Sequence, residues 1–347
     1  MKQALVISGG GSKGAFSVGV IKDLVGTYRI DFDILVGTST GALIAPLAAL
    51  GELEKLEELY TTVTNDRILK KYNFGERVIN GDISIFTFGP LKETIRNIYD
   101  DAYFNRLMNS GKEVYLTTAC LQTEELVVFT TARDPKPNKC YKTVTLVNGD
   151  QFRAAVLASA SQPVFTPPVK VNENVPGEIN KNYQYVDGGV REYAGLAMAV
   201  DAGAAEVFTI LHASRNPQPD NTQLKAIFPI LERTIAMFIT DVGDNDLNTP
   251  LQFNEALKYI NDVKINMKKM GVPQADIDKY FTLPGTPCIF QNREPLKIHI
   301  IQPDQPLGGG PGGLDFNPTE MRQMLASGRN ALQVYVANLR PGDVVWA

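Results

Sequence analysis

Short apolar runs and helix-like stretches alternate along the first part of the chain. Residues 4–8 form an apolar run typical of a buried strand, and residues 15–25 then carry apolar side chains at helical spacing. A second apolar run, 34–36, precedes a run of small residues, 42–50, that is typical of a helix. Because a strand, a helix and a strand within about 30 residues form a right-handed unit, the strands should be parallel neighbours. The turns after both strands should then lie at one edge of the sheet, where open α/β sheets bind ligands.

The rest of the chain continues this mixed pattern and adds a long polar region. Strands at 113–119 and 125–131 could pair as an antiparallel hairpin, and residues 221–280 are mostly helical with charged faces. Further helices are predicted at 52–63, 90–99, 151–160, 196–202 and 318–338, further strands at 141–147, 183–186, 206–211 and 296–301, and a mobile glycine loop at 308–313.

Composition and charge narrow the functional classes. The 347 residues are 44% hydrophobic and 21% charged, as in globular proteins, and a net charge of −4 gives no hint of a nucleic-acid partner. Cys120, Cys140 and Cys288 are widely spaced, so reduced thiols are expected and no zinc site is indicated. The run at 4–8 is too short for a signal-peptide core, and no apolar run reaches the about 18 residues of a membrane span. We expect a cytoplasmic protein; peripheral membrane contact, or secretion without a signal peptide, stays compatible with this.

The second strand ends in Gly-x-Ser-x-Gly, from Gly37 to Gly41, directly before a predicted helix. A strand, a sharp turn and a helix form the context of a nucleophile elbow. Because Gly37 and Gly41 have no side chains, the strand and the helix can approach closely. The turn would expose the Ser39 hydroxyl near a helix N-terminus, which favours a developing anion. Ser39 is the candidate nucleophile, and the alternative is a glycine-flanked turn that happens to contain serine.

The first strand leads into a glycine-rich turn. Consecutive glycines can direct several backbone N–H groups toward one point, because no Cβ blocks access. Such donors stabilise the oxyanion of acyl transfer by about 2.7–4 kcal/mol each. Gly10 and Gly11 would supply these donors and Lys13 a positive field, although an ordinary tight turn is the alternative. The predicted oxyanion hole comprises Gly9, Gly10, Gly11, Lys13 and Gly14.

The same glycines match the Gly-x-Gly-x-x-Gly pattern of dinucleotide-binding proteins. Such a site needs an acid at the carboxyl end of the second strand, whereas Asp31 and Asp33 lie at its start, about 10 Å away. A P-loop needs lysine where Ala15 follows Gly14. Neither nucleotide site is favoured.

A third motif, Asp187-Gly188-Gly189, follows the predicted strand at 183–186. A serine nucleophile needs a base, and Asp187 can serve if it lies within hydrogen-bonding reach of Ser39. The alternative is a solvated Asp-Gly turn.

Together these motifs resemble the patatin-like phospholipase family. Residues 9–14 match its Gly-Gly-Gly-x-Lys/Arg-Gly loop, 37–41 its elbow, and 187–189 its Asp-Gly-Gly/Ala turn. Residues 158–163 match a fourth family block, Ala-Ser-x-x-x-Pro. All four occur in the family's order over about 4–211, and the chain after about residue 216 shows no such match.

The resemblance implies an α/β protein, a three-layer α/β/α sandwich with a mostly parallel central sheet, here with a helical cap. It implies a lipid acyl hydrolase of phospholipase A or lysophospholipase type, working through a Ser39–Asp187 dyad without metal or cofactor. Its partner would be a phospholipid or other acyl lipid, with Gly37, Gly41, Gly188 and Gly189 supporting the turns. We expect one catalytic domain over 1–347, with the motifs in about 4–211, a helical insertion or cap at about 217–285, and a closing strand and helix at about 296–338.

Two other functions stay open. Ser39, Asp187 and His212 follow the chain order of a conventional triad, so an esterase acting on soluble esters is one alternative. A catalytically silent lipid-binding module is the other.

The insertion contains one metal-like pattern and two apolar segments. Asp244, Asp246, Asn248 and Glu255 have calcium-loop spacing, but Thr249 stands where glycine is needed and a proline follows, so a polar loop between helices is favoured. Segments 227–231 and 235–239 could line an acyl pocket or a lid, although core contacts are favoured.

Overall fold

A central sheet of eight strands organises the part of the chain that the computed structural model describes, residues 1–68, 70–71, 84, 86–219, 223–282, 285, 289–290 and 293–339. The strand order is β10-β9-β1-β2-β5-β6-β7, with β8 paired to β5. The pairings from β10 to β5 are parallel, whereas β6 and β8 run antiparallel to β5. The strands are β1 (Lys2–Ile7), β2 (Ile34–Gly37), β5 (Glu113–Cys120), β6 (Leu126–Thr130), β7 (Lys142–Thr145), β8 (Tyr185–Asp187), β9 (Ala204–Ile210) and β10 (Lys297–Ile301); β3 (Lys70–Lys71) and β4 (Phe86–Thr87) form a separate pair.

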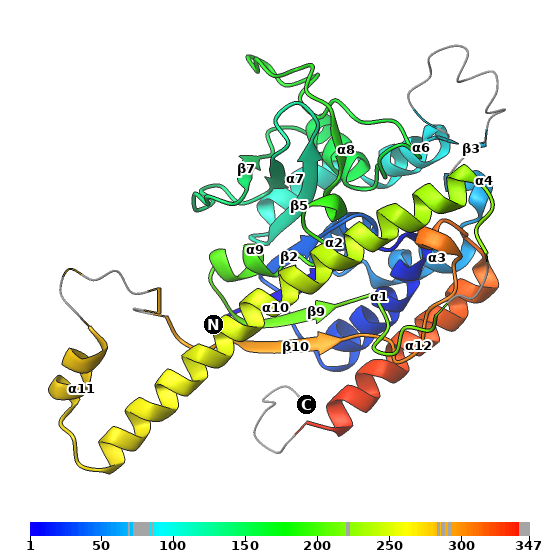
Figure 1. The fold of residues 1–347 in the computed structure, drawn as a ribbon. Coiled ribbons are helices and arrows are strands. Elements are labelled where there is room, and N and C mark those ends of the chain that lie inside the picture. Colours follow the sequence, from blue (N-terminus) through cyan, green and yellow to red (C-terminus); the bar gives the residue numbers. More distant parts are fainter. Residues whose placement is uncertain are drawn as a thin grey trace.

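Alternate residues of β1 face the two sides of the sheet. Leu5 and Ile7 belong to one apolar cluster, and Ala4 and Val6 to the other, as the two-residue period of a strand requires. All four are fully buried, so helices must cover both faces. The first face is covered by α1 (Gly14–Ile21), α2 (Thr40–Ala49), α8 (Gly149–Ser159) and α12 (Pro318–Ala337), and the second by α9 (Leu196–Asp201) and α10 (Ile227–Lys269) (Figure 1).

The predicted α/β sandwich with a mostly parallel sheet is therefore confirmed. The predicted hairpin is also present as β5 and β6. The helix α7 (Asp101–Asn109) was not predicted; the Asp100 side chain caps its N-terminus by accepting a hydrogen bond from the N–H of Tyr103. Other short elements are α3 (Leu53–Thr62), α4 (Asn65–Ile68), α6 (Gly89–Ile98), α11 (Gln274–Phe281), the 3-10 turns η1 (Gly11–Lys13), η3 (Gly188–Val190) and η4 (Pro311–Gly313), and the π-helical turn η2 (Lys22–Thr27).

The largest departure from the sequence prediction is α10, a single helix of 43 residues that includes Pro250. A proline removes one helical hydrogen bond, but tertiary contacts hold this helix on both sides of it. Leu247 packs against the apolar cluster beneath, and the Asn254 amide exchanges two hydrogen bonds with the backbone of Leu296. The predicted polar loop between helices at 244–255 is wrong, because these residues lie on one continuous helix, which also lacks the shape of a calcium loop.

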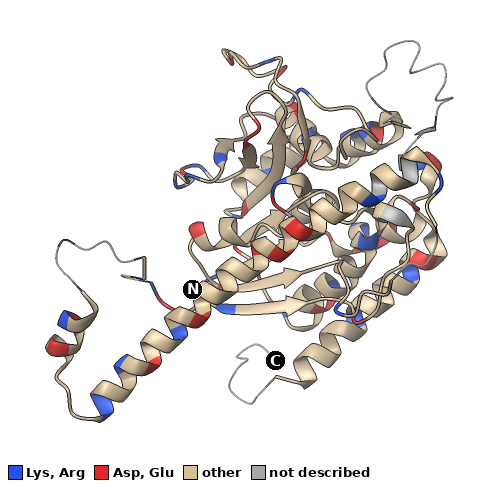
Figure 2. Cartoon of the chain, viewed as in Figure 1, with Lys and Arg blue, Asp and Glu red and all other residues tan. Residues whose placement is uncertain are grey.

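The far part of α10, together with α11, projects beyond the sheet (Figure 1). Acidic side chains lie along the middle of α10, and lysines follow toward its end, among them Lys264, Lys268 and Lys269 (Figure 2). Within the described residues, no helix combines the length and the apolar character needed to cross a membrane. Cys288 and parts of the predicted insertion lie outside the described residues.

Candidate active site

Ser39 lies at the turn between β2 and α2, at the carboxyl edge of the sheet. Its backbone has φ 57° and ψ −119°, a conformation that residues other than glycine rarely adopt. A Cβ on Gly37 would overlap the carbonyl group of Gly41, and a Cβ on Gly41 would overlap that of Ile7. Glycine at both positions therefore permits this sharp turn, at which Ser39 lines a cavity.

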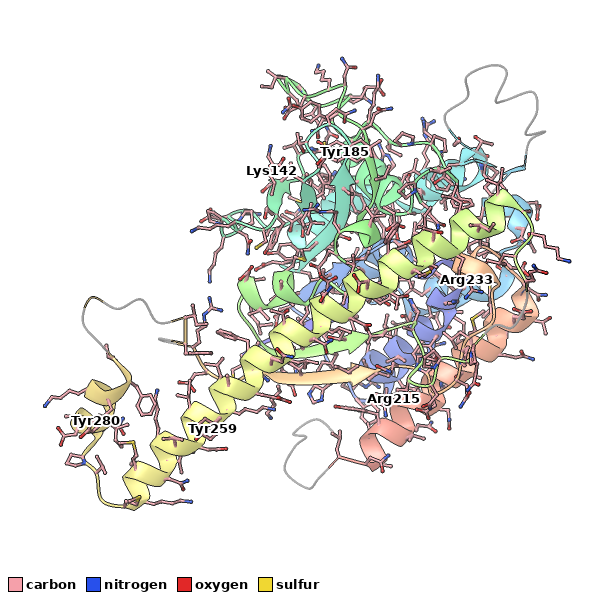
Figure 3. The ribbon with its side chains drawn as sticks, viewed as in Figure 1. Lys142, Tyr185, Arg215, Arg233, Tyr259 and Tyr280 are labelled. Atoms are coloured by element: carbon pink, nitrogen blue, oxygen red, sulfur yellow. The ribbon has the colours of Figure 1, made fainter. Side chains whose placement is uncertain are left out.

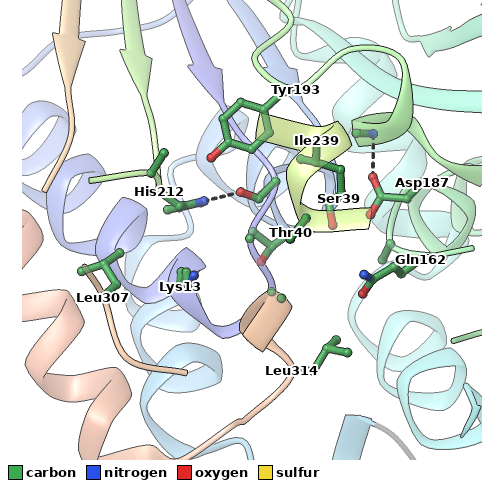
Figure 4. A pocket seen from close by; sticks show the side chains of 18 of the residues that line it. Lys13, Ser39, Thr40, Gln162, Asp187, Tyr193, His212, Ile239, Leu307 and Leu314 are labelled. Atoms are coloured by element: carbon green, nitrogen blue, oxygen red, sulfur yellow. Dashed lines mark hydrogen bonds between the residues drawn. The ribbon is translucent and has the colours of Figure 1, made fainter. Parts of the chain in front are cut away.

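The end of β8 brings Asp187 to the same place. Its carboxylate accepts a hydrogen bond, 2.8 Å long, from the N–H of Gly189 (Figure 4). Burial raises the pKa of Asp187 to about 6, and the neighbouring Ser39 hydroxyl and the Gly189 N–H oppose that rise. Such a carboxyl group is a stronger base than an ordinary aspartate and is still ionised at neutral pH.

The segment 158–163 supports both residues. The hydroxyl of Ser159 accepts a hydrogen bond of 3.0 Å from the Ser39 N–H, and the carbonyl of Ser161 accepts one of 2.8 Å from the Asp187 N–H. Both serines are fully buried. The sequence motifs matched this segment to a family block but predicted no role for it. The pair of serines at the end of a helix of small residues was the one signal of a supporting role in the sequence.

The glycine loop lies directly beside Ser39. A Cβ on Gly9 would stand 3.1 Å from the Cβ of Ser39. Gly10 and Gly11 have φ values of 154° and 57°, and their backbone N–H groups donate no hydrogen bond within the described residues. Two such donors next to a serine suit an oxyanion that forms on the substrate.

The surroundings of the loop explain its shape. The backbone of Gly313, in the second glycine-rich segment, packs so closely that a Cβ on Gly11 would overlap its carbonyl group. Gly14 begins α1 against α2, where a Cβ would lie 2.6 Å from the Thr40 hydroxyl. Lys13 lines the cavity, and burial lowers its pKa.

His212 follows β9 and is almost fully buried. Its Nδ1 lies 2.8 Å from the Gly9 carbonyl and 3.2 Å from the Ser8 hydroxyl, and its Nε2 lies 2.7 Å from the Ser17 hydroxyl. Since a carbonyl can only accept, Nδ1 carries the proton, and Nε2 then accepts from Ser17. Burial lowers the pKa of His212 to about 4, so the ring is neutral at physiological pH.

The cavity around Ser39 has a volume of about 820 Å³, in the range of small-molecule sites. The inner face of α10 forms one wall with Ile239, Thr240 and Leu247. Arg215, in the loop after β9, and Arg233, on α10, add positive charge to the lining (Figure 3). An apolar arm extends between α2, α3 and α6 and is lined by Leu43, Leu59, Val63, Leu91, Ile95 and Ile98.

Three comparisons relate this chain to known proteins. VipD from Legionella pneumophila aligns over 97% of this chain and 67% of its own, with 14% identity and a TM-score of 0.44. A cUMP-AMP-activated phospholipase of Escherichia coli is 42% identical over 64 residues, so the match spans 17% of this chain and only 20% of that protein. A family model, patatin-like phospholipase, matches residues 5–200, which is more than half of the chain. The chain therefore belongs to the patatin-like phospholipase family.

Proposed function

We propose that this protein is a lipid acyl hydrolase of phospholipase A or lysophospholipase type, with Ser39 as nucleophile and Asp187 as general base. The observation that carries the proposal is the position of the Ser39 hydroxyl beside a buried carboxylate with a raised pKa, in the lining of one cavity. Both groups border a cavity with an apolar arm, which suits an acyl chain.

The chemistry then runs in two stages. The Ser39 oxygen attacks the ester carbonyl carbon while Asp187 accepts the hydroxyl proton, and the negative charge on the former carbonyl oxygen is held by the N–H groups of Gly10 and Gly11. Asp187 returns the proton to the leaving alcohol, which leaves an acyl group on Ser39. Asp187 then takes a proton from water, whose oxygen attacks this ester; as the bond from the acyl carbon to the Ser39 oxygen breaks, Asp187 returns the proton to that oxygen and the fatty acid is released. No metal or cofactor takes part in this scheme.

The hydrogen bonds of His212 favour a dyad over a Ser-His-Asp triad. Both ring nitrogens already bond to Ser8, Ser17 and Gly9. A histidine that relayed the proton would need one nitrogen toward Ser39 and the other toward an acid. We therefore assign His212 the role of supporting the glycine loop.

Lipid substrates reside in membranes, and α10 offers a surface for contact with them. Its outer face exposes Ile227, Ile230, Met237 and Phe238, whose exposed fractions run from 49% to 79%. At 3.6 residues per turn these side chains fall within an arc of roughly 100°. The sequence favoured core contacts for these segments. That prediction is wrong for these four side chains, because they are exposed. We propose that this face rests on the lipid surface from the cytoplasmic side, while the inner face lines the cavity.

A covalent probe of serine nucleophiles tests the assignment. A fluorophosphonate should add to Ser39 in the wild-type protein, and intact-mass and peptide mass spectrometry would locate the adduct. Asp187→Asn should slow this labelling at least about a hundredfold, because the hydroxyl loses its base. Labelling at another residue, or at equal rates in both proteins, would contradict the proposal.

A further inference from the structure

A second pair of acidic residues, one buried and one half-buried, lies outside the proposed chemistry. Glu192 follows the Asp187 turn and is 8% exposed. Asp246 lies on α10, and its carboxyl group neighbours that of Glu192, so that each influences the pKa of the other. Because two ionised carboxylates so close together would repel each other, this arrangement favours a single proton shared by the pair.

Each carboxyl group also binds the backbone between them. The Glu192 carboxylate accepts a hydrogen bond of 2.7 Å from the Gly195 N–H, and Asp246 accepts one of 2.6 Å from the Tyr193 N–H. The α10 backbone comes close enough that a Cβ on Gly243 would lie 2.6 Å from the Tyr193 ring. The segment after Asp187 and the cavity wall formed by α10 are thus joined at this point.

The same segment also reaches Ser39. The carbonyl of Glu192 accepts a hydrogen bond of 3.3 Å from the hydroxyl of Thr38, the residue that precedes Ser39. Thr38 in turn accepts one of 2.8 Å from Thr117 on β5. The acidic pair therefore connects three parts of the site: the serine turn, the aspartate turn and α10.

The electrostatics of the pair follow from its surroundings. Burial, and next the charge of Asp246, raise the pKa of Glu192 to about 8; burial also raises the pKa of Asp246. Two tyrosines are neighbouring titratable groups. Tyr141 lies near Glu192 and donates its hydroxyl hydrogen to Asp201. The Tyr193 phenol interacts with Ser8 and with the backbone of residues 212 and 213. Arg191 on the same turn is exposed, and Asp187 lies before the turn, where it accepts a hydrogen bond from Gly189. Asp244, on α10, is exposed. Among the residues that the structure describes, the groups that shift these two pKa values include no cation.

We propose that Glu192 and Asp246 are positioning residues that share one proton and clasp α10 to the catalytic turn. While the proton is present, the clasp closes the cavity and holds the Asp187 turn in register with Ser39. When the second carboxyl group ionises, repulsion weakens the clasp and frees this part of α10. The role in catalysis rests on the proposed function, but the clasp itself does not.

The sign of the pH effect follows from the raised pKa values. An acid that is harder to ionise in the closed state stabilises closure at low pH, and this contribution is lost as pH rises through the closed-state pKa of about 8. As the pH rises toward this pKa, the equilibrium constant for opening can increase by up to about tenfold for each pH unit. Opening of α10 should therefore increase with pH and level off above about pH 8.

Hydrogen exchange in the Ser39→Ala background tests the clasp without reference to activity. Exchange protection of residues 233–250, corrected for the intrinsic effect of pH, should fall at least about tenfold between pH 6.0 and 8.5. Asp246→Asn should abolish most of this fall, because an amide donates to Glu192 without a titrating proton, and Glu192→Gln should do the same from the other side. Asp241→Asn, an exposed carboxylate on the same helix, is the matched control and should behave like the parent protein. Equal falls in all variants, or none in the parent, would overturn the clasp.

Activity supplies the second readout. The maximal rate of ester hydrolysis should fall in Asp246→Ala. Asp246→Asn should restore this rate, and its activity should extend to higher pH than that of the wild type. A general loss of stability would lower both variants alike and leave the profile unshifted, which would contradict a positioning role. If the wild-type protein hydrolyses no ester, the proposed function fails, and the exchange measurement still decides the clasp.

Discussion

The Nδ1 of His212 lies 2.8 Å from the carbonyl oxygen of Gly9 and donates its hydrogen to it. Through this bond the His212 ring holds the glycine loop in place. The ring also packs against the next residue of the loop, because a Cβ on Gly10 would stand 2.8 Å from the same nitrogen. The backbone donors beside Ser39 thus depend on a side chain that takes no part in proton transfer in our scheme.

His212→Ala should therefore act mainly on stability. Removing the ring takes the acceptor from the buried Ser17 hydroxyl, at a cost of about 1–3 kcal/mol, and leaves the Gly9 carbonyl with only the longer hydrogen bond, 3.4 Å, from the Ser8 hydroxyl. The melting temperature should fall, while the pH dependence of the remaining activity stays unchanged. Thermal unfolding and a pH series of kcat/KM measure this. A loss of kcat as deep as that of Ser39→Ala, in a protein that melts normally, would instead place His212 in the proton path.

The pKa of Asp187 predicts the acid side of the pH profile. The base must be ionised to accept the serine proton, so kcat/KM should rise with pH and reach half its maximum near pH 6. The measurement is kcat/KM on a soluble ester whose own charge does not change between pH 4.5 and 8, an interval chosen to bracket about pH 6. A midpoint near pH 4, as for an ordinary aspartate, would contradict the assignment.

Asp187→Asn should inactivate the protein and yet stabilise it at pH 8. The folded-state pKa of Asp187 is raised, so its contribution to stability is present at low pH and is lost as pH rises through about 6. The amide of the asparagine variant does not ionise, so its burial carries no such loss of stability at high pH. The melting temperature of the variant should exceed that of the wild type at pH 8, and the difference should shrink toward pH 4.5. A constant difference would show that burial of the charge is not its source.

The outer face of α10 predicts different effects on dispersed and bilayer substrates. Met237→Gln combined with Phe238→Gln should reduce hydrolysis of vesicle phospholipids roughly tenfold or more, because two exposed apolar side chains no longer enter the lipid surface. Hydrolysis of a soluble short-chain ester should stay near the wild-type rate. Val334→Gln, at an exposed apolar position on α12, is the control. Equal losses on both substrates would point to damage within the cavity.

Ser159 offers a test of the support beneath the nucleophile. Ser159→Ala leaves the partly buried Ser39 N–H without its acceptor, which costs about 1–3 kcal/mol at most and loosens the strained turn. We expect a lower kcat with a nearly unchanged KM, and partial recovery in Ser159→Thr, which keeps the hydroxyl. An unchanged kcat in the alanine variant would argue against this role.

The sequence predicted those parts of the fold and site that depend on local patterns. Glycine spacing located the turns at Ser39 and Asp187, and apolar periodicity located the sheet, because strands and tight turns are determined over a few residues. The roles of Ser159 and Glu192 could not be predicted, since each depends on a partner far along the chain. Pro250 suggested a break in α10, but packing of Leu247 and the Asn254 contacts outweigh one lost hydrogen bond.

Fatty-acid release from mixed phospholipid vesicles, with a chelator present, tests the central claim most directly. It compares the wild type with Ser39→Ala, Asp187→Asn and His212→Ala, each confirmed as folded. The Ser39–Asp187 account predicts release by the wild type and by His212→Ala, and none above background by the other two. Full activity in Asp187→Asn, or complete loss in a folded His212→Ala protein, would contradict it.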